Sequence, residues 1–153
     1  MTEPKRIIRL VPGLLLVALL GAAVLVRLAP TDPAAWHVDP TTITKPDKPN
    51  HWLLAMGGDA PPMALALPPG QAAARLDAIA LATPRTVRLA GQGAHVTYVT
   101  RSALWGFPDY TSVKITPTAT GSQLSFFARA RFGRSDMGVN RARLEDWLHQ
   151  LAL

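Results

Sequence analysis

The sequence predicts an α+β protein in which an N-terminal transmembrane helix precedes a helix, a four-stranded antiparallel sheet and a C-terminal helix. Three features support this fold class. The chain has one long apolar run near its start, alternating apolar residues in its second half, and an amphipathic segment at its end. Strands that follow one another through short turns pair antiparallel, and the flanking helices then pack on one face of the sheet.

The first element is an apolar run that covers residues 10–26. With Ile7, Ile8 and Leu28, the run reaches the roughly 20 residues that a helix needs to cross a bilayer. The sequence therefore predicts a single-pass membrane helix from about Ile7 to Leu28. A cleaved signal peptide and a helix buried in the domain are the alternatives. Cleavage after Ala29 would place Arg27 where a signal peptidase requires a small residue.

Basic residues flank this run unequally, since three of them precede it and one follows it closely. Lys5, Arg6 and Arg9 precede the run, whereas Arg27 follows it together with Asp32. Because positively charged flanks stay on the cytoplasmic side, the N-terminus is predicted to be cytoplasmic. The remaining domain is then predicted to lie on the periplasmic side of a bacterial inner membrane.

The composition excludes several classes of protein. The chain has 153 residues and a net charge of +6, about half of which lies beside the apolar run. The rest is mildly basic and has no basic helix interleaved with aromatic residues, so nucleic acid is not a predicted partner. The chain has no cysteine, which excludes disulfides, zinc–thiolate sites and a thiol nucleophile.

A proline-rich stretch separates the apolar run from the rest of the chain. Nine of the fourteen prolines fall within residues 30–69, which disfavours regular helix there. Trp36 and Trp52 are too apolar for a solvated tether, so we expect an extended strap over the domain. The predicted division is therefore an anchor at 1–29, a linker or strap at 30–69, and a compact α+β domain at 70–153.

The compact domain begins with a helix and ends with one. Apolar residues at helical spacing predict the first helix, and β-branched residues around a Gly-Gln-Gly turn predict a hairpin. Asp136 or Asn140 is expected to cap the last helix. In chain order, the predicted elements are a helix at 70–81, strands at 86–90, 95–101, 110–116 and 123–132, and a helix from about 139, with Leu144, Trp147, Leu148 and Leu151 forming its apolar stripe.

The last strand has the clearest alternation. Leu124, Phe126 and Ala128 share one face with Ala130 and Phe132. Side chains alternate between the two faces of a strand. The sequence therefore predicts one buried face, and the opposite face carries Gln123, Ser125, Phe127, Arg129 and Arg131.

Two segments resemble a known family. The sequence Phe-Pro-Asp-Tyr at residues 107–110 and the stretch SFFARARFGRSDMGVNRARL at residues 125–144 resemble the bacterial and plastid family known as domain of unknown function 1499. The Trp-His-Val-Asp-Pro and Pro-Asn-His-Trp-Leu pieces of the strap are similar to its membrane-anchored members. Ala128 and Ala130 stand where many members have serine, and the resemblance implies no activity and no catalytic residue.

Arginines gather around the end of the last strand and the start of the last helix. Arginine suits phosphate or carboxylate because its planar guanidinium donates two parallel hydrogen bonds. We therefore predict an anion or lipid-headgroup site here. The alternative is an ion pair of Arg131 with Asp109 or Asp136 that only fixes the loop. The predicted ligand-binding residues are Asp109, Tyr110, Arg129, Arg131, Ser135, Asp136, Asn140 and Arg143.

The leading functional hypothesis is a non-enzymatic envelope module that binds an anionic or amphiphilic small ligand, or a membrane-protein partner. The competing hypothesis is an enzyme that acts on an envelope lipid or cell-wall intermediate through Asp109, Asp136 and Tyr110. No nucleotide-binding or serine-hydrolase motif occurs in the sequence. His37, Asp39, His51 and Asp59 lack the spacing of a metal site. No cofactor, metal ligand or catalytic residue is predicted.

Overall fold

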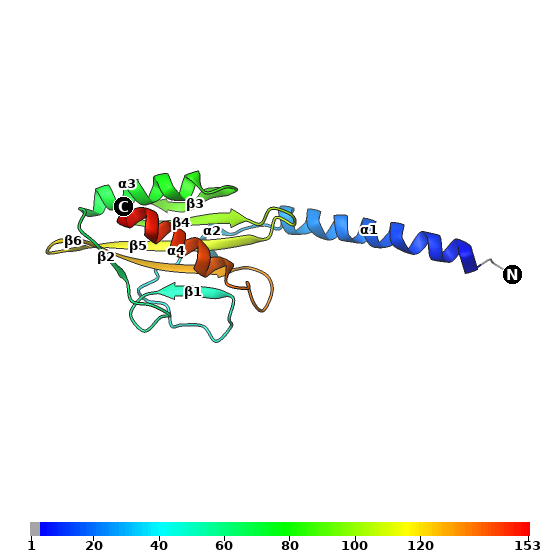
Figure 1. Ribbon diagram of the computed structural model, residues 1–153, viewed down its shortest axis with the longest axis horizontal. Helices are drawn as coiled ribbons and strands as arrows, with labels where there is room; N and C mark the ends of the chain where they lie inside the picture. Colours follow the sequence, from blue (N-terminus) through cyan, green and yellow to red (C-terminus); the bar gives the residue numbers. More distant parts are fainter. Residues whose placement is uncertain (1–3) are drawn as a thin grey trace.

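The computed structural model describes residues 4–153, with side chains from Pro12 onward. The side chains of Lys5, Arg6, Ile7, Ile8, Arg9 and Leu10, on which the predicted span and its orientation depend, lie outside this described part. The chain forms one α+β domain with a helix that extends from one end (Figure 1).

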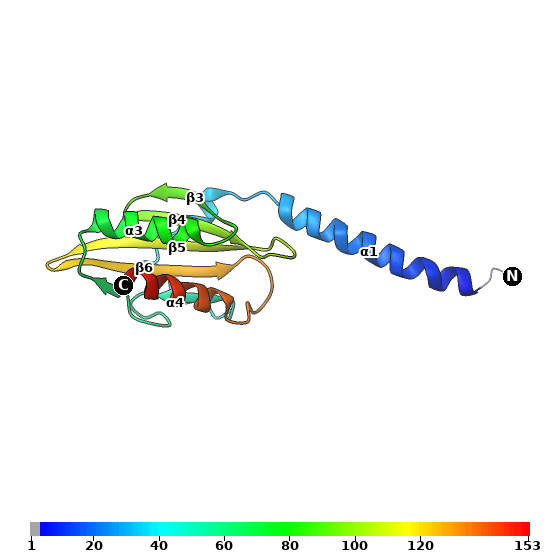
Figure 2. The ribbon, with the colours of Figure 1, turned by 45° about the horizontal axis from the view of Figure 1, so that its top comes forward.

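The extended helix is α1 (Pro4–Leu28), which contains Pro12 and ends one residue after Arg27. Figures 1 and 2 show it projecting along the long axis of the molecule, away from the sheet. At its end, the Arg27 side chain donates a 2.7 Å hydrogen bond to the Leu104 carbonyl. Within the described residues, no helix combines the length and the apolarity that crossing a membrane requires.

The sheet has six strands instead of the predicted four. They are antiparallel, in the order β1-β6-β5-β4-β3, and β2 also pairs with β6. The two additional strands come from the proline-rich strap, where short strands between prolines and glycines show too little alternation to be predicted. Their bounds are β1 (His51–Leu54), β2 (Met63–Leu65), β3 (Thr86–Gln92), β4 (His95–Arg101), β5 (Pro108–Thr118) and β6 (Gly121–Ala130).

Two helices cover one face of the sheet, α3 (Pro69–Ala82) and α4 (Val139–Ala152) (Figures 1 and 2). The alternation predicted for β6 is confirmed, because Leu124, Phe126 and Ala128 are fully buried on this face. Trp147 of α4 is also fully buried, and its indole nitrogen donates to the Thr83 hydroxyl, 2.8 Å away. This face holds the main hydrophobic core.

The opposite face is buried as well, although the alternation in the last strand predicted only one buried face. The leading strap, residues 30–49, lies over it and includes the short helix α2 (Pro33–Trp36). Thr97 and Ser112 are fully buried there. The Thr97 hydroxyl donates to the Ser112 oxygen at 3.0 Å, and Ser112 donates to the Trp36 carbonyl at 3.0 Å. The polar side chains of this face therefore bond to one another and to the strap backbone.

His37 secures the leading strap to the β3–β4 hairpin. Its ring stacks on His95 with 3.9 Å between centroids, and its Nδ1 shares a 2.9 Å hydrogen bond with the Thr97 hydroxyl. The ring fits because residue 91 is glycine. A Cβ added to Gly91 would lie 2.6 Å from His37 Cε1, and the backbone there has a φ of 70°.

Acid should loosen the leading strap through His37. Burial, followed by the neighbouring His95 and Lys114, lowers the pKa of His37 from 6.5. Unfolded His37 therefore takes up a proton more readily than folded His37, so its contribution to stability is complete above about pH 6.5 and falls as the pH drops below that value. Asp39, which pairs with Lys114 at 3.4 Å, keeps its charge across this range because its own pKa is lowered.

We expect faster hydrogen exchange in residues 36–43 at about pH 5 than at about pH 7, after correction for intrinsic rates. The measurement uses the full chain and mass spectrometry. His37→Gln should reduce this difference because it removes the titrating group. Equal corrected exchange rates at both pH values would contradict the assignment of this pH dependence to His37.

Candidate functional site

The eight predicted site residues fall into two groups on opposite faces of the sheet. The register of β5 and β6 places Tyr110 opposite Arg129, on the face that the leading strap covers. Asp109 lies on the other face, because neighbouring residues of a strand alternate. The strap-side group is Tyr110, Arg129 and Arg131, and the α4-side group is Asp109, Ser135, Asp136, Asn140 and Arg143.

Arg129 binds the leading strap. Its guanidinium carbon lies 5.0 Å from the ring centre of Trp36 and 4.5 Å from that of Phe127. One nitrogen donates to the Trp36 carbonyl at 2.7 Å. Burial lowers the pKa of Arg129 to about 10, so the group stays charged at neutral pH. No carboxylate pairs with it among the described side chains.

Tyr110 and Arg131 extend this attachment toward the end of α1. The Tyr110 ring stacks on Trp36 at 3.9 Å, and its hydroxyl shares a 3.0 Å hydrogen bond with Thr31. Arg131 donates to the Pro30 carbonyl at 3.0 Å and to the Thr31 hydroxyl at 3.4 Å. Arg129 of β6 and Arg131, just after its end, therefore both hold the backbone that follows α1.

The alternative ion pair of Arg131 with Asp109 or Asp136 does not form among the described side chains. Arg143 takes the predicted place of Arg131, with 2.8 Å between its Nη2 and Asp109 Oδ2. Arg143 also donates to the Asn140 side-chain oxygen at 3.1 Å. Burial raises the pKa of Asp109, and Asp136 raises it further, while Arg143 opposes both effects. Arg131 lies on the opposite face of the sheet from Asp109, because Asp109 is opposite Ala130 and side chains alternate along a strand.

The N-cap of α4 is Gly138, and Asp136, two residues before it, bonds to the first turn of the helix through its carboxylate. Its carboxylate accepts hydrogen bonds from the backbone nitrogens of Gly138 at 3.1 Å and Asn140 at 2.9 Å, and from the Asn140 side chain at 2.7 Å. The Ser135 hydroxyl accepts from the Met137 nitrogen at 3.1 Å. These groups already occupy the amides of Met137, Gly138 and Asn140, to which an anion at this helix start would bind.

The residues of the enzyme hypothesis converge in part. Asp109 and Asp136 line a pocket of about 300 Å³ with Phe107 and Met137 on its wall. Tyr110 is fully buried under Trp36 on the other face and does not reach this pocket. In the part of the chain that the structure describes, no group of three or more His, Cys, Asp or Glu side chains is placed to hold a metal ion.

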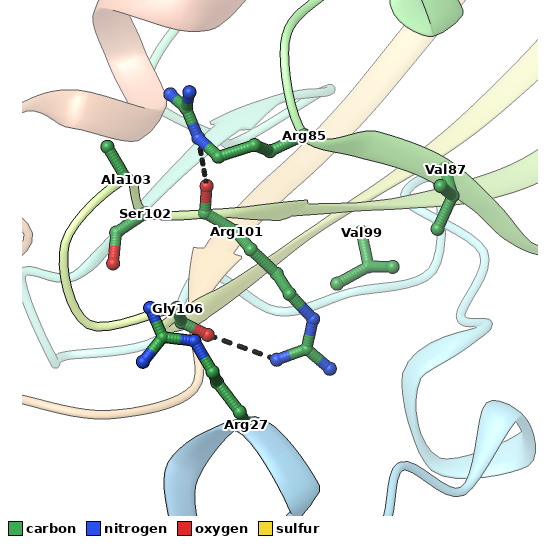
Figure 3. Close-up of a pocket in the computed structure, with 8 residues that line it drawn as sticks. All are labelled: Arg27, Arg85, Val87, Val99, Arg101, Ser102, Ala103 and Gly106. Carbon is green, nitrogen blue, oxygen red and sulfur yellow. Dashed lines mark hydrogen bonds between the residues drawn. The ribbon is translucent and has the colours of Figure 1, made fainter. Parts of the chain in front are cut away.

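A second pocket lies between the end of α1 and the sheet, and the sequence analysis missed it. This arginine pocket has a volume of about 440 Å³, and its lining includes Arg27, Arg85 and Arg101, with Val87 and Val99 (Figure 3). Its arginines come from α1, the start of β3 and the end of β4. No local motif contains them, so only the fold brings them together.

Exposed apolar side chains occupy the same end of the domain. We call Leu104, Phe107, Phe132 and Met137 the apolar tip. Phe107 and Phe132 pack with 5.8 Å between ring centres. The β4–β5 loop, which carries Leu104 and Phe107, lies next to the end of α1 in both ribbon views, and the β6–α4 loop, which carries Phe132 and Met137, lies at the same end of the domain (Figures 1 and 2). The sequence signal for the tip was weak, because single apolar residues in loops are common.

These features define an α+β domain with a strap across its sheet, an exposed N-terminal helix, and a pocket at their junction. The family described as "Protein of unknown function (DUF1499)" matches residues 38–151. The chain therefore belongs to this family, which confirms the resemblance in residues 107–110 and 125–144. No curated protein matches the chain.

One similar solved structure is the crystal structure of protein MLL2253 from Mesorhizobium loti. It is 13% identical, covers 66% of this chain and 95% of its own, and gives a TM-score of 0.48.

Two arginine–tryptophan pairs among the described side chains differ in burial, and their coupling energies should differ accordingly. Cation–π attraction reaches about 2 kcal/mol when the pair is desolvated and about 0.5–1 kcal/mol when it is exposed. We expect a larger value for Arg129 with Trp36, which are both half-buried, than for Arg141, which lies 4.7 Å from the Trp52 ring and is exposed.

The measurement is urea unfolding of the full chain, with a double-mutant cycle for each pair (Arg129→Met with Trp36→Leu, and Arg141→Met with Trp52→Leu). The second cycle is the matched control. Equal coupling energies in the two cycles would show that Arg129 does not hold the strap in the way described.

Proposed function

We propose that this protein is a non-enzymatic envelope module that is anchored in a bacterial inner membrane by α1 and rests with one end of its domain on the periplasmic surface of the bilayer. The observation that carries this proposal is the position of the apolar tip at the end of the domain from which the apolar helix α1 extends. The tip and α1 then meet the same bilayer from the same side.

The described part of α1 supports the membrane anchor because apolar side chains point outward all around it. Leu14 is 69% exposed, Val17 67% and Leu25 72%. A helix that is apolar on every side is stable only inside a large core or a bilayer. This exposure disfavours the alternative of a helix buried in the domain. The full span also requires Ile7, Ile8 and Leu10, whose side chains lie outside the described residues.

The apolar tip supports contact with the interfacial region of a bilayer. Leu104 is 74% exposed and Met137 is 91% exposed. Met137 has a backbone φ of 54°, a conformation that costs a residue with a side chain about 1 kcal/mol or more. Because the Met137 side chain is exposed, no packing in the core offsets this backbone cost. Burial of the thioether chain in a bilayer would offset that cost.

Positive charge around the apolar tip fits an anionic membrane surface. Arg27, Arg101 and Arg134 lie on the same loops or at the end of α1, and Arg134 is exposed. Each arginine near an anionic bilayer contributes about 1 kcal/mol of attraction at best. Arg129 and Arg131 bind the strap and are not available to an anion. We therefore assign the anion-binding face to the arginines around the apolar tip.

The enzyme hypothesis receives less support. It needs a third group near Asp109 and Asp136, and Tyr110 is bound to Thr31 and Trp36 on the opposite face. The pocket beside Asp109 and Asp136 is lined in part by residues of the apolar tip. Membrane contact through the tip therefore explains its exposed apolar wall without an enzymatic role. The proposal keeps the N-terminus in the cytoplasm, because the basic residues Lys5, Arg6 and Arg9 precede the apolar run.

Labels at the apolar tip should report a bilayer. Because the chain has no cysteine, Leu104→Cys and Met137→Cys each give one site for an environment-sensitive fluorophore. In vesicles of phosphatidylethanolamine and phosphatidylglycerol, we expect a blue-shifted emission at both sites and quenching by spin-labelled lipids.

The matched control is Met56→Cys, since Met56 is apolar and 83% exposed but lies in the β1–β2 connection. This label should remain accessible to aqueous iodide. If labels at residues 104 and 137 were as accessible to iodide as the label at residue 56, the domain would not rest on the membrane through its apolar tip.

A further inference from the structure

We propose that the arginine pocket binds the phosphate group of an anionic amphiphile, with Arg27 and Arg101 holding the phosphate and Val87 and Val99 contacting the apolar chain. This inference rests on the proposed function and deepens it, because it names a ligand class for the end of the domain that faces the membrane. The chemistry is that of a phosphodiester or phosphomonoester attached to a hydrocarbon chain.

The two arginines that would hold the phosphate approach each other across Gly106. Arg101 Nη1 donates to the Gly106 carbonyl at 3.0 Å, and Arg27 Nη2 donates to the Leu104 carbonyl at 2.7 Å. Figure 3 shows both guanidinium groups near Gly106, while the Arg85 guanidinium points away from them. Arg27 and Arg101 are therefore placed on two sides of one small space.

Both guanidinium groups retain free donors. A guanidinium has five N–H groups, and only one nitrogen of each group is engaged with a backbone carbonyl. Among the described side chains, no ion pair includes Arg27, Arg85 or Arg101, whereas Arg88, Arg141 and Arg143 each pair with a carboxylate. Unneutralised arginines that keep several donors are suited to phosphate oxygens.

The backbone around the pocket is built to keep these arginines in place. A Cβ added to Gly106 would lie 2.8 Å from Arg27 Cγ, so only glycine lets α1 approach the β4–β5 loop this closely. Arg85 has a φ of 60° and donates from Nε to the Arg101 carbonyl at 3.0 Å, while its own carbonyl accepts from the Arg101 nitrogen at 3.0 Å. Arg85 is thus a positioning residue for Arg101.

The remaining wall of the pocket is apolar. Val87 and Val99 face each other across β3 and β4, and Val87 is 58% exposed. A pocket of about 440 Å³ is within the usual range for small-molecule sites. Two cationic groups beside exposed Val87 and largely buried Val99 match a ligand with a charged head and an apolar chain. A free inorganic phosphate would leave the valines without a partner.

The test is lipid binding to the delipidated full chain in a nonionic detergent, followed by native mass spectrometry. With added phosphatidylglycerol, we expect one retained lipid per chain, and Arg101→Ala should weaken its binding by about tenfold or more. Arg27→Ala should do the same, and this variant lies outside the folded domain. Arg75→Ala is the matched control, since Arg75 also donates to one backbone carbonyl, that of Gln150 at 3.0 Å, but lies on α3.

A second arm uses inorganic phosphate as a competitor. Displacement of the lipid only at a large excess of phosphate supports an amphiphile site, whereas equal affinity for phosphate and lipid would overturn the role of the valine pair. Equal lipid retention by the unmodified chain, both variants and the control would overturn the site itself. Because the experiment is made in detergent, its failure leaves the labelling test of membrane contact unaffected.

Discussion

The structure depends most on the guanidinium of Arg129, which is held between the rings of Trp36 and Phe127 and bonded to the Trp36 carbonyl. A buried charge without a carboxylate is costly unless aromatic rings and backbone carbonyls replace its water. Here they do so, and they fasten the leading strap across the sheet. Because the strap follows α1 directly, this attachment also fixes where the helix leaves the domain.

The two faces of the sheet consequently have different roles. The α3–α4 face holds the apolar core, which includes Phe126 and Trp147. The strap face holds hydrogen-bonded side chains and two arginines that are used within the chain. Arginines at the end beside α1 have no carboxylate partner among the described side chains, and exposed apolar loops surround them. An anionic, partly apolar partner fits this end better than it fits either face of the sheet.

The sequence predicted α3, α4 and the four strands β3–β6, because apolar or β-branched residues recur in each of them at helical or strand spacing. It missed β1 and β2, which have only four and three residues and owe their strand conformation to pairing with β6. The candidate site was predicted less well. Arg129 and Asp109 lie near one another in the sheet but on opposite faces, so a cluster in the sequence became two separate groups. The arginine pocket combines residues that lie far apart in the chain.

The most direct test of this account is the distance between α1 and the domain, measured by pulsed electron paramagnetic resonance. Spin labels at Leu28→Cys and Met56→Cys occupy exposed positions in a chain without other cysteines. For the full chain in lipid nanodiscs, the account predicts one narrow distance distribution, which broadens when Arg129→Ala is added. A broad distribution before that substitution would contradict the claim that Arg129 and the leading strap hold α1 against the domain.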